Sequence, residues 1–243
     1  MKIVFVINNI DFLLSHRLEV CLRCIELGYN VHVIAPYKSN KIKILQNYNI
    51  RYHELNFKRK TNNIIFELYT IYRLFRLIYV IKPDILHLIT IKPYLYGGIV
   101  SKILNVKNVV TSIAGLGIVY SSDKITYKIL KFLLKPFLKY ALSNKSQSII
   151  FQNKSDYKLL INMGIIRSQN IIFTKGSGVD LNKYEYFNEN NCKPLKVIFA
   201  SRLLKDKGVE IFIKAAEEFF LSDIDIEFWL VGEPDEGNKN SIT

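Results

Sequence analysis

The sequence alternates between short apolar runs, of the length of buried strands, and longer segments with the period of amphipathic helices. It opens on a continuous apolar run at residues 2–7, which is typical of a strand buried on both faces of a parallel sheet. A helix predicted over residues 14–27 ends at Gly28, and the next strand, 30–35, stops at Pro36. This alternation predicts a doubly wound α/β sheet, in which ligands bind at the carboxyl ends of the strands.

The pattern continues along the chain and then restarts after a polar interruption. We predict further strands at 51–55, 84–89, 108–112, 148–151 and 170–174, and helices at 63–81, 94–104, 124–142 and 154–163. The segment NENNCKP, residues 188–194, breaks the pattern and is interpreted as a linker. A strand at 195–200, a helix at 208–220 and a strand at 226–231 follow. The prediction is therefore a first domain over 1–187 and the first βαβ unit of a second Rossmann-like domain over 195–243.

Positive charge is concentrated in the first domain. The 243 residues carry a formal net charge of +13, yet residues 191–243 hold seven Lys and Arg against ten Asp and Glu. The remainder holds 27 basic and 11 acidic residues, which favours a polyanionic partner or simply a lysine-rich solvated surface. No nucleic-acid-binding module is recognisable, so we expect no nucleic-acid partner.

Cysteine content and the amino terminus bear on cofactors and location. Cys21 and Cys24 lie three apart on a predicted helix, and no second pair of Cys or His residues completes a zinc site with them. With Cys192 they are interpreted as packing residues, and we expect no metal and no cofactor. The first residues lack a signal-peptide pattern, and no uncharged stretch reaches membrane-spanning length. We expect a cytoplasmic protein, peripheral on the inner face of the plasma membrane.

The segment SRLLKDKG, residues 201–208, carries the strongest chemical signal. It follows a buried strand and opens a helix, so Arg202 and Lys207 would stand at a strand's carboxyl end beside a helix amino terminus. Two cations, backbone N–H groups and the helix dipole would together suit a diphosphate. Two solvated basic residues in a βα loop explain the spacing equally well.

Eight segments follow one another along the chain: FLLSHR, GYNVHVIAP, DILHLITIKPYLYGG, AGLG, IIFQN, GSGVD, SRLLKDKG and LVGEPDEGN. In this order they resemble the family 4 glycosyltransferases, which have the two-domain GT-B fold. The last five together resemble the capsular polysaccharide and O-antigen branch of that family. The family's glutamate-containing motif would lie beyond Thr243, so we expect a chain truncated within its second domain, with little or no transferase activity by itself.

The resemblance implies a reaction and roles for particular residues. In the family, the second domain holds the nucleotide-sugar diphosphate, the first presents the acceptor, and the sugar is transferred with retention and without a metal. Arg202 and Lys207 would neutralise the departing diphosphate and, with Gly208, bind the donor. His87 matches a family histidine near the transferred sugar, although Ile89 stands where many members have a second histidine. A packed, hydrogen-bonded core histidine is the alternative for His87.

Two further regions are candidate ligand contacts at the strand ends. Glycines permit close backbone approach to a ligand, so we assign Gly115 and Gly117 to donor binding, with a plain turn as the alternative. The glycines at 176 and 178 admit the same two interpretations. By the resemblance, the acceptor side of the cleft would include Asn8, Asn9, His16 and Arg17, for which helix capping and surface charge are the alternatives.

A stripe of lysines runs along the helix predicted over 124–142. Spacings of four, three, four and four residues place them on one narrow stripe, and no acidic residue interrupts the segment. Pro136 should kink this helix. The stripe favours a surface for anionic lipid headgroups, or else a core-packed helix with a soluble lysine face. Its members are Lys124, Lys128, Lys131, Lys135 and Lys139.

Three functional hypotheses follow from these observations. The first is transfer of a hexose or N-acetylhexosamine from a nucleotide sugar, with UDP as the expected nucleotide, to a lipid-diphosphate-linked saccharide in surface polysaccharide synthesis. The second is an epimerase of the UDP-N-acetylglucosamine type, which shares the fold but needs no lysine stripe. The third is a non-catalytic remnant or acceptor-binding subunit.

Overall fold

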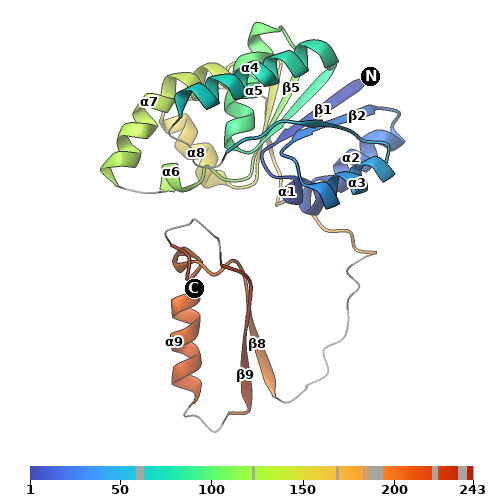
Figure 1. The fold of residues 1–243 in the computed structure, drawn as a ribbon. Coiled ribbons are helices and arrows are strands. Elements are labelled where there is room, and N and C mark those ends of the chain that lie inside the picture. Colours follow the sequence, from blue (N-terminus) through green and yellow to red (C-terminus); the bar gives the residue numbers. More distant parts are fainter. Residues whose placement is uncertain are drawn as a thin grey trace. The chain divides into compact units, whose positions relative to one another are not determined.

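The chain forms two compact units, Met1–Val179 and Asp180–Thr243, which are described separately (Figure 1). The computed structural model describes residues 1–58, 63–121, 124–167, 170–182, 184, 186, 194–220, 224–234 and 240–242. The linker predicted over 188–194 lies outside these residues except for Pro194. The domain bounds 1–187 and 195–243 therefore stay a prediction.

The first unit is built on a seven-stranded sheet in the order β3-β2-β1-β4-β5-β6-β7. Every neighbouring pair of strands is parallel. The strands are β1 (Lys2–Ile7), β2 (Asn30–Ala35), β3 (Arg51–Glu54), β4 (Ile85–Ile89), β5 (Asn108–Ile113), β6 (Gln147–Phe151) and β7 (Asn170–Phe173). The predicted α/β class is confirmed, and the strand order reverses direction between β1 and β4.

Helices cover both faces of this sheet, as right-handed crossovers require (Figure 1). One face carries α1 (Ile10–His16), α2 (Leu18–Glu26) and α3 (Ser39–Asn47), and the other carries α4 (Ile64–Ile81), α5 (Ile91–Ile103), α7 (Ile125–Ala141) and α8 (Lys154–Asn162). A short helix, α6 (Ile118–Ser121), precedes α7.

The opening strand shows why its sequence is apolar at every position. Val4 and Val6 pack into the core on the α4–α5 side, whereas Phe5 and Ile7 pack into the core on the α1–α3 side. All four side chains are fully buried. A strand with helices on both faces has no solvent side, so the usual alternation of polar and apolar residues is absent.

The helix predicted over 14–27 is wrong in its bounds, because the structure contains two helices there. Asn9 caps the first of them, α1, by accepting hydrogen bonds from Asp11 N at 2.8 Å and Phe12 N at 3.3 Å. The helical path breaks at Arg17, whose φ is −135°, and α2 continues from there. Cys21 on α2 is buried and Cys24 is half-buried, and both are free thiols.

Helix α3 was not predicted, because its sequence SNKIKILQN gives only a short and weak apolar stripe. Helix α6 is only four residues long and escaped prediction for the same kind of reason. Helix α7 runs through Pro136 without ending. These differences lie at element bounds and in short helices, where tertiary contacts decide the conformation.

Two adjacent glycines allow α5 to pack closely on its neighbours. A Cβ atom at Gly98 would lie 2.5 Å from the backbone oxygen of Ala141 in α7. A Cβ atom at Gly97 would lie 2.4 Å from a methyl group of Leu88 in β4. Helix α5 thus sits between the sheet and α7 at distances that a larger residue does not permit.

We expect Gly98→Ala to destabilise the first unit by about 2 kcal/mol, because the Ala141 carbonyl is backbone and cannot move aside. Gly97→Ala is the matched comparison: its new methyl group meets the end of the Leu88 side chain, which can shift more readily than a backbone carbonyl, so we expect a smaller loss of stability. Urea unfolding followed by circular dichroism measures both free energies of unfolding. Equal stability of the two variants would contradict this account of the close approach.

The second unit is a single βαβ arrangement. Strands β8 (Leu195–Ala200) and β9 (Ile226–Val231) are parallel, and α9 (Val209–Phe220) connects them. Phe212 of α9 lies 5.3 Å from Phe199 and 5.5 Å from Phe228, ring centroid to centroid, so one aromatic cluster joins the helix to both strands. A 3-10 turn, η1 (Lys205–Lys207), precedes α9.

Candidate functional site

The carboxyl ends of β1 and β4 meet where the strand order of the large sheet reverses. Adjacent strands of such sheets diverge there into helices on opposite faces, which opens a crevice for ligands. Asn8 follows β1 directly and Thr90 follows β4 directly. This switch point is therefore the first place to examine the predicted site residues of the first unit.

His87 lies inside β4 and is buried, with 7% of its surface exposed. Its Nε2 is 2.8 Å from the Ser112 hydroxyl of β5, and its ring centroid is 5.1 Å from that of Phe5. Burial, with a smaller contribution from the Arg17 charge, lowers the pKa of His87 to about 3. The imidazole is therefore neutral at physiological pH, so it serves as a hydrogen-bonding group and is a weak base.

Arg17 is a buried cation at the same end of the sheet. Its Nη1 donates to the Ser177 hydroxyl at 3.0 Å and to the His16 carbonyl at 3.0 Å, while its Nε is buried without a protein partner. Gln152, just after β6, also donates to the Ser177 hydroxyl, at 3.3 Å. Ser177 therefore links the α1–α2 junction to the segments that follow β6 and β7.

The other residues assigned to the acceptor side have local contacts. Asn9 caps α1, and Asn8 is half-buried beside it. His16 is exposed: its ring stacks on Phe12 with centroids 4.4 Å apart, and its Nδ1 is 2.6 Å from the Ser15 hydroxyl. These contacts agree with the helix-capping alternative for Asn9 and leave a ligand role for His16 a prediction.

Thr90 has a backbone conformation that β-branched residues rarely adopt. Its φ is 74° and its ψ is 161°, and its hydroxyl is buried without a protein hydrogen-bond partner. Such strain persists only where surrounding contacts enforce it, and it is concentrated at functional sites. The loop that contains Gly115 and Gly117 reaches the turn at Thr90, because a Cβ atom at Gly117 would lie 3.2 Å from Ile91 Cδ1. Gly115 is exposed in the same loop.

The donor residues predicted from SRLLKDKG all lie in the loop between β8 and α9 of the second unit. Arg202 and Lys207 are exposed, and Lys205 forms an ion pair with Glu210 at 3.0 Å. Gly208 ends the 3-10 turn with φ 86° and leads into α9. The two cations thus stand at the carboxyl end of β8 and the amino end of a twelve-residue helix.

Gly232 fixes the shape of this loop from the β9 side. A Cβ atom there would lie 1.8 Å from the Ser201 carbonyl oxygen, so only glycine fits. The backbones that leave β8 and β9 therefore run in direct contact at the start of the loop that carries Arg202.

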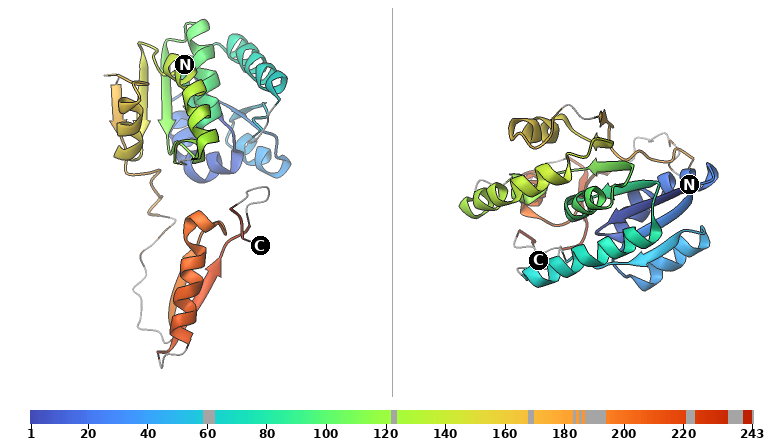
Figure 2. Two further views of the ribbon diagram at one scale, coloured as in Figure 1. Left: turned by 90° about the vertical axis from the view of Figure 1, so that its left-hand side faces the viewer. Right: turned by 90° about the horizontal axis from the view of Figure 1, so that it is seen from above.

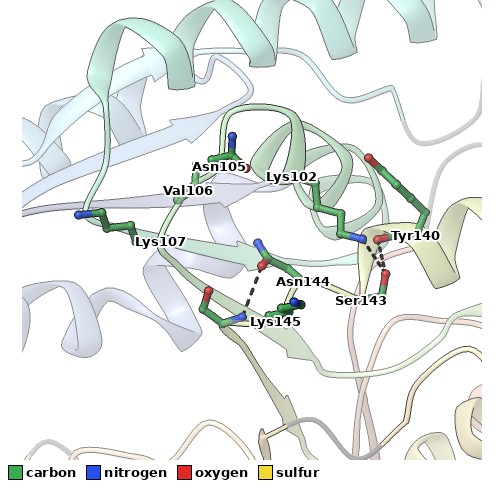
Figure 3. A pocket seen from close by; sticks show the side chains of 9 residues that line it. Lys102, Asn105, Val106, Lys107, Tyr140, Ser143, Asn144 and Lys145 are labelled. Atoms are coloured by element: carbon green, nitrogen blue, oxygen red, sulfur yellow. Dashed lines mark hydrogen bonds between the residues drawn. The ribbon is translucent and has the colours of Figure 1, made fainter.

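A hollow of about 510 Å³ lies at the opposite edge of the large sheet, where the strands begin (Figure 3). Its lysines are Lys102 in the last turn of α5, and Lys107 and Lys145 in the loops that follow α5 and α7. Lys102 donates to the Ser143 hydroxyl at 2.8 Å and lies 4.2 Å from the Tyr140 ring centroid. Lysines at helix carboxyl ends complement the helix dipole, so this hollow needs no ligand to explain its charge.

A pair of histidines lies elsewhere in the first unit, on two neighbouring strands. In β2 and β3, His32 Nδ1 lies 2.9 Å from His53 Nε2, with the two rings stacked. Burial, then the neighbouring His53 and other positive charges, lowers the pKa of His32 to about 4. Within the described ranges, no three His, Cys, Asp or Glu side chains are arranged to hold a metal ion.

Sequence reasoning did not identify Ser112, Gln152, Ser177 or Thr90. Ser177 lies between two glycines that were noted, so the segment GSGVD carried a signal for it. The contacts of Gln152 and Ser112 join residues far apart in sequence, and no local pattern marks them. The strain at Thr90 is a tertiary effect that its sequence neighbours do not indicate.

The family model described as "Glycosyl transferase 4-like" matches residues 2–153, well over half of the chain. No curated protein matches the chain.

Solved structures share the fold at low sequence identity. A glycosyltransferase from Rickettsia africae is 16% identical with a TM-score of 0.67, over 95% of this chain and 60% of that one. Anabaena Alr3699/HepE, in complex with UDP and glucose, is 18% identical with a TM-score of 0.66, over 98% of this chain and 62% of that one. A UDP-GlcNAc 2-epimerase from Neisseria meningitidis, bound to UDP-GlcNAc, is 16% identical with a TM-score of 0.55, over 99% of this chain and 67% of that one. The chain thus spans less than two thirds of the first two structures.

Proposed function

The chain belongs to the glycosyl transferase 4-like family, and from this premise we propose that it transfers a hexose or N-acetylhexosamine from a UDP-sugar to a lipid-diphosphate-linked saccharide. The observation that carries the donor half of this proposal is the loop between β8 and α9. There Arg202 and Lys207 stand beside a helix amino terminus. The Anabaena structure, whose complex holds UDP and glucose, supports the choice of nucleotide.

The chemistry of the proposed reaction concentrates charge on the leaving group. When the bond between the sugar and the diphosphate breaks, negative charge grows on the diphosphate oxygens. Preorganised cations and helix N–H groups that face those oxygens stabilise the transition state more than the ground state. Arg202 and Lys207 would carry this role, and the amino end of α9, just after Gly208, would add backbone donors.

The first unit would supply the acceptor side and the surroundings of the transferred sugar. Its neutral His87 would donate or accept a hydrogen bond at a sugar hydroxyl, since its pKa of about 3 makes proton abstraction unfavourable. The Arg17 cation, with an unpaired Nε, would favour an anionic group on the acceptor. Gly117, which with Gly115 would bind the donor, lies beside the strained turn into α5. Retention at the anomeric carbon and a place in surface polysaccharide synthesis follow from the motif resemblance.

An epimerase acting on UDP-N-acetylglucosamine is the second candidate function. The shared fold with the Neisseria enzyme, at a TM-score of 0.55, favours it. The two reactions differ at C2 of the sugar. Inversion at C2 must break the C2–H bond, whereas glycosyl transfer leaves that bond intact: it breaks the bond from the anomeric carbon to the diphosphate, forms a bond to the acceptor oxygen and releases the proton of the acceptor hydroxyl.

This difference provides the test. The protein is incubated in D₂O with UDP-N-acetylglucosamine, and the C2 proton is followed by NMR. We expect no exchange at C2. In parallel, any label from radioactive UDP-hexoses that enters the organic phase, however little this chain transfers by itself, should do so only when a lipid extract containing diphosphate-linked saccharides is present. Exchange at C2 without acceptor would establish the epimerase reaction and contradict our proposal.

A further inference from the structure

Helices α4 and α7 flank α5 on one face of the large sheet (Figure 2). Helix α5 contacts both of them and is buried along most of its length. The outward surface of this layer is therefore made by α4 and α7. We call the exposed side chains of these two helices the α4–α7 face.

Helix α7 presents large apolar side chains to solvent beside its lysines. Phe132 is 77% exposed and Leu133 is 56% exposed, so neither side chain turns into the core. Three lysines are exposed on the same helix, whereas Lys131 is half-buried. The other exposed apolar residues of α7 are Ile125, Ile129, Leu130, Phe137 and Tyr140, and its exposed lysines are Lys128, Lys135 and Lys139; Lys124 is exposed at its N-cap.

Helix α4 repeats this combination, which the sequence did not indicate. Ile65 is 78% exposed, and Arg73 and Arg76 lie among exposed tyrosines. Arg73 donates to the Tyr69 hydroxyl at 3.1 Å, and Arg76 donates to the Tyr72 hydroxyl at 3.3 Å. The exposed apolar and aromatic residues of α4 are Ile64, Ile65, Leu68, Tyr69, Tyr72, Tyr79 and Val80.

The α4–α7 face lacks negative charge. Helix α7 contains no Asp or Glu, and the one acid of α4, Glu67, is occupied by Lys92 and Tyr96 of α5. Isolated apolar residues on a surface are common. So many exposed apolar residues on two helices of one layer are unusual for a surface in contact with water alone.

We propose that the α4–α7 face docks on an anionic lipid bilayer, with its cations at the headgroups and its apolar and aromatic side chains at the acyl boundary. Interfacial proteins combine these features: basic residues attracted to anionic lipid, aliphatic residues that insert shallowly, and aromatic rings at headgroup depth. No helix among the described residues has the length and hydrophobicity to cross a membrane. The protein therefore lies on the bilayer through this face.

The positive charge of the α4–α7 face favours an anionic bilayer over a second copy of the chain as its partner. Two copies that paired through this face would bring the lysines of one α7 against basic residues of the other, without acids to compensate them. Anionic headgroups, in contrast, attract each such residue by roughly 1 kcal/mol. A purely polyanionic partner would leave Ile65 and Phe132 unexplained, because it offers no apolar phase.

The test is co-sedimentation with vesicles made of equal parts phosphatidylcholine and phosphatidylglycerol, and with pure phosphatidylcholine vesicles. The charge variant Lys128→Glu/Lys135→Glu/Lys139→Glu is compared with a matched control, Lys43→Glu/Lys196→Glu/Lys214→Glu. The control makes the same charge change outside this face, on α3, β8 and α9. Two apolar variants, Phe132→Ser/Phe137→Ser on α7 and Ile65→Ser/Leu68→Ser on α4, test the two helices separately. Circular dichroism confirms that each variant is folded.

We expect the wild type to bind the anionic vesicles, and to bind less at high salt. The charge variant should lose at least about 100-fold in affinity and the control far less. Each apolar variant should lose at least about 100-fold in affinity, since it removes two side chains and the burial of each contributes about 1.5 kcal/mol or more. Equal binding by the charge variant and the control would overturn the proposal. Apolar variants that bind like the wild type would also overturn it. A third contradicting outcome is a wild-type dimer that does not bind vesicles, if the apolar substitutions convert that dimer to monomer. The nucleotide-sugar proposal does not depend on this result.

Discussion

Lowering the pH from 7 to 5 is expected to remove about 4 kcal/mol from the stability of the first unit, because two buried histidines are neutral in the folded state. The folded pKa of His32 is about 4 and that of His87 about 3, both because burial disfavours the charged form. The unfolded chain binds these protons near pH 6.5. Between pH 6.5 and 4 the unfolded state thus binds more protons than the folded state. The free energy of unfolding of the first unit therefore rises with pH and falls on acidification. Each histidine contributes about 2 kcal/mol of the loss.

Urea unfolding at the two pH values measures this loss, and the chain contains its own reference. All four histidines lie in the first unit, whereas the single tryptophan, Trp229, lies in the second. Circular dichroism should therefore show that the first unit is less stable at pH 5. Tryptophan fluorescence, which reports on the second unit, should not show this loss of stability. His87→Gln should reduce the pH dependence by about half. A first unit that is equally stable at pH 7 and pH 5 would refute the burial of neutral histidines.

Removing both loop cations should weaken UDP binding by at least about 100-fold, because each charge-assisted hydrogen bond to phosphate contributes about 1.5–3 kcal/mol. The variant is Arg202→Ala/Lys207→Ala. Lys205→Ala is its matched control, since Lys205 lies in the same loop and is ion-paired with Glu210. Isothermal titration calorimetry gives the affinities, and Trp229 fluorescence checks the fold of the second unit. If the control loses as much affinity as the double variant, general charge and not a built diphosphate site attracts the ligand.

Most of the fold was predictable because the large sheet is covered on both faces. A strand such as β1 is then an apolar run, and β2 lies between Gly28 and Pro36, and single-sequence patterns identify both features. The break at Arg17 was not predictable, since α1 and α2 carry apolar residues on either side of it. The close packing of α5 was also not predictable, because it depends on what Gly98 meets in α7.

The candidate site was predictable to a lesser extent, for a related reason. Strand ends locate the edge at which ligands bind, so residues such as His87 and Arg202 were identified by position. Their partners come from distant segments: Ser112 contacts His87 across 25 residues, and Ser177 contacts Arg17 across 160. The α4 half of the α4–α7 face was missed because α4 is apolar almost all round, and only the structure shows which side is exposed.

The central claim is that the loop from Ser201 to Gly208 holds the diphosphate of a nucleotide sugar. Titration of isotope-labelled protein with UDP and with uridine, followed by NMR of the backbone amides, tests it most directly. The account predicts that UDP shifts the amides of this loop and of the first turn of α9, and that uridine, which lacks the phosphates, shifts them much less. Equal shifts with UDP and uridine, or UDP-induced shifts that avoid the loop, would contradict it.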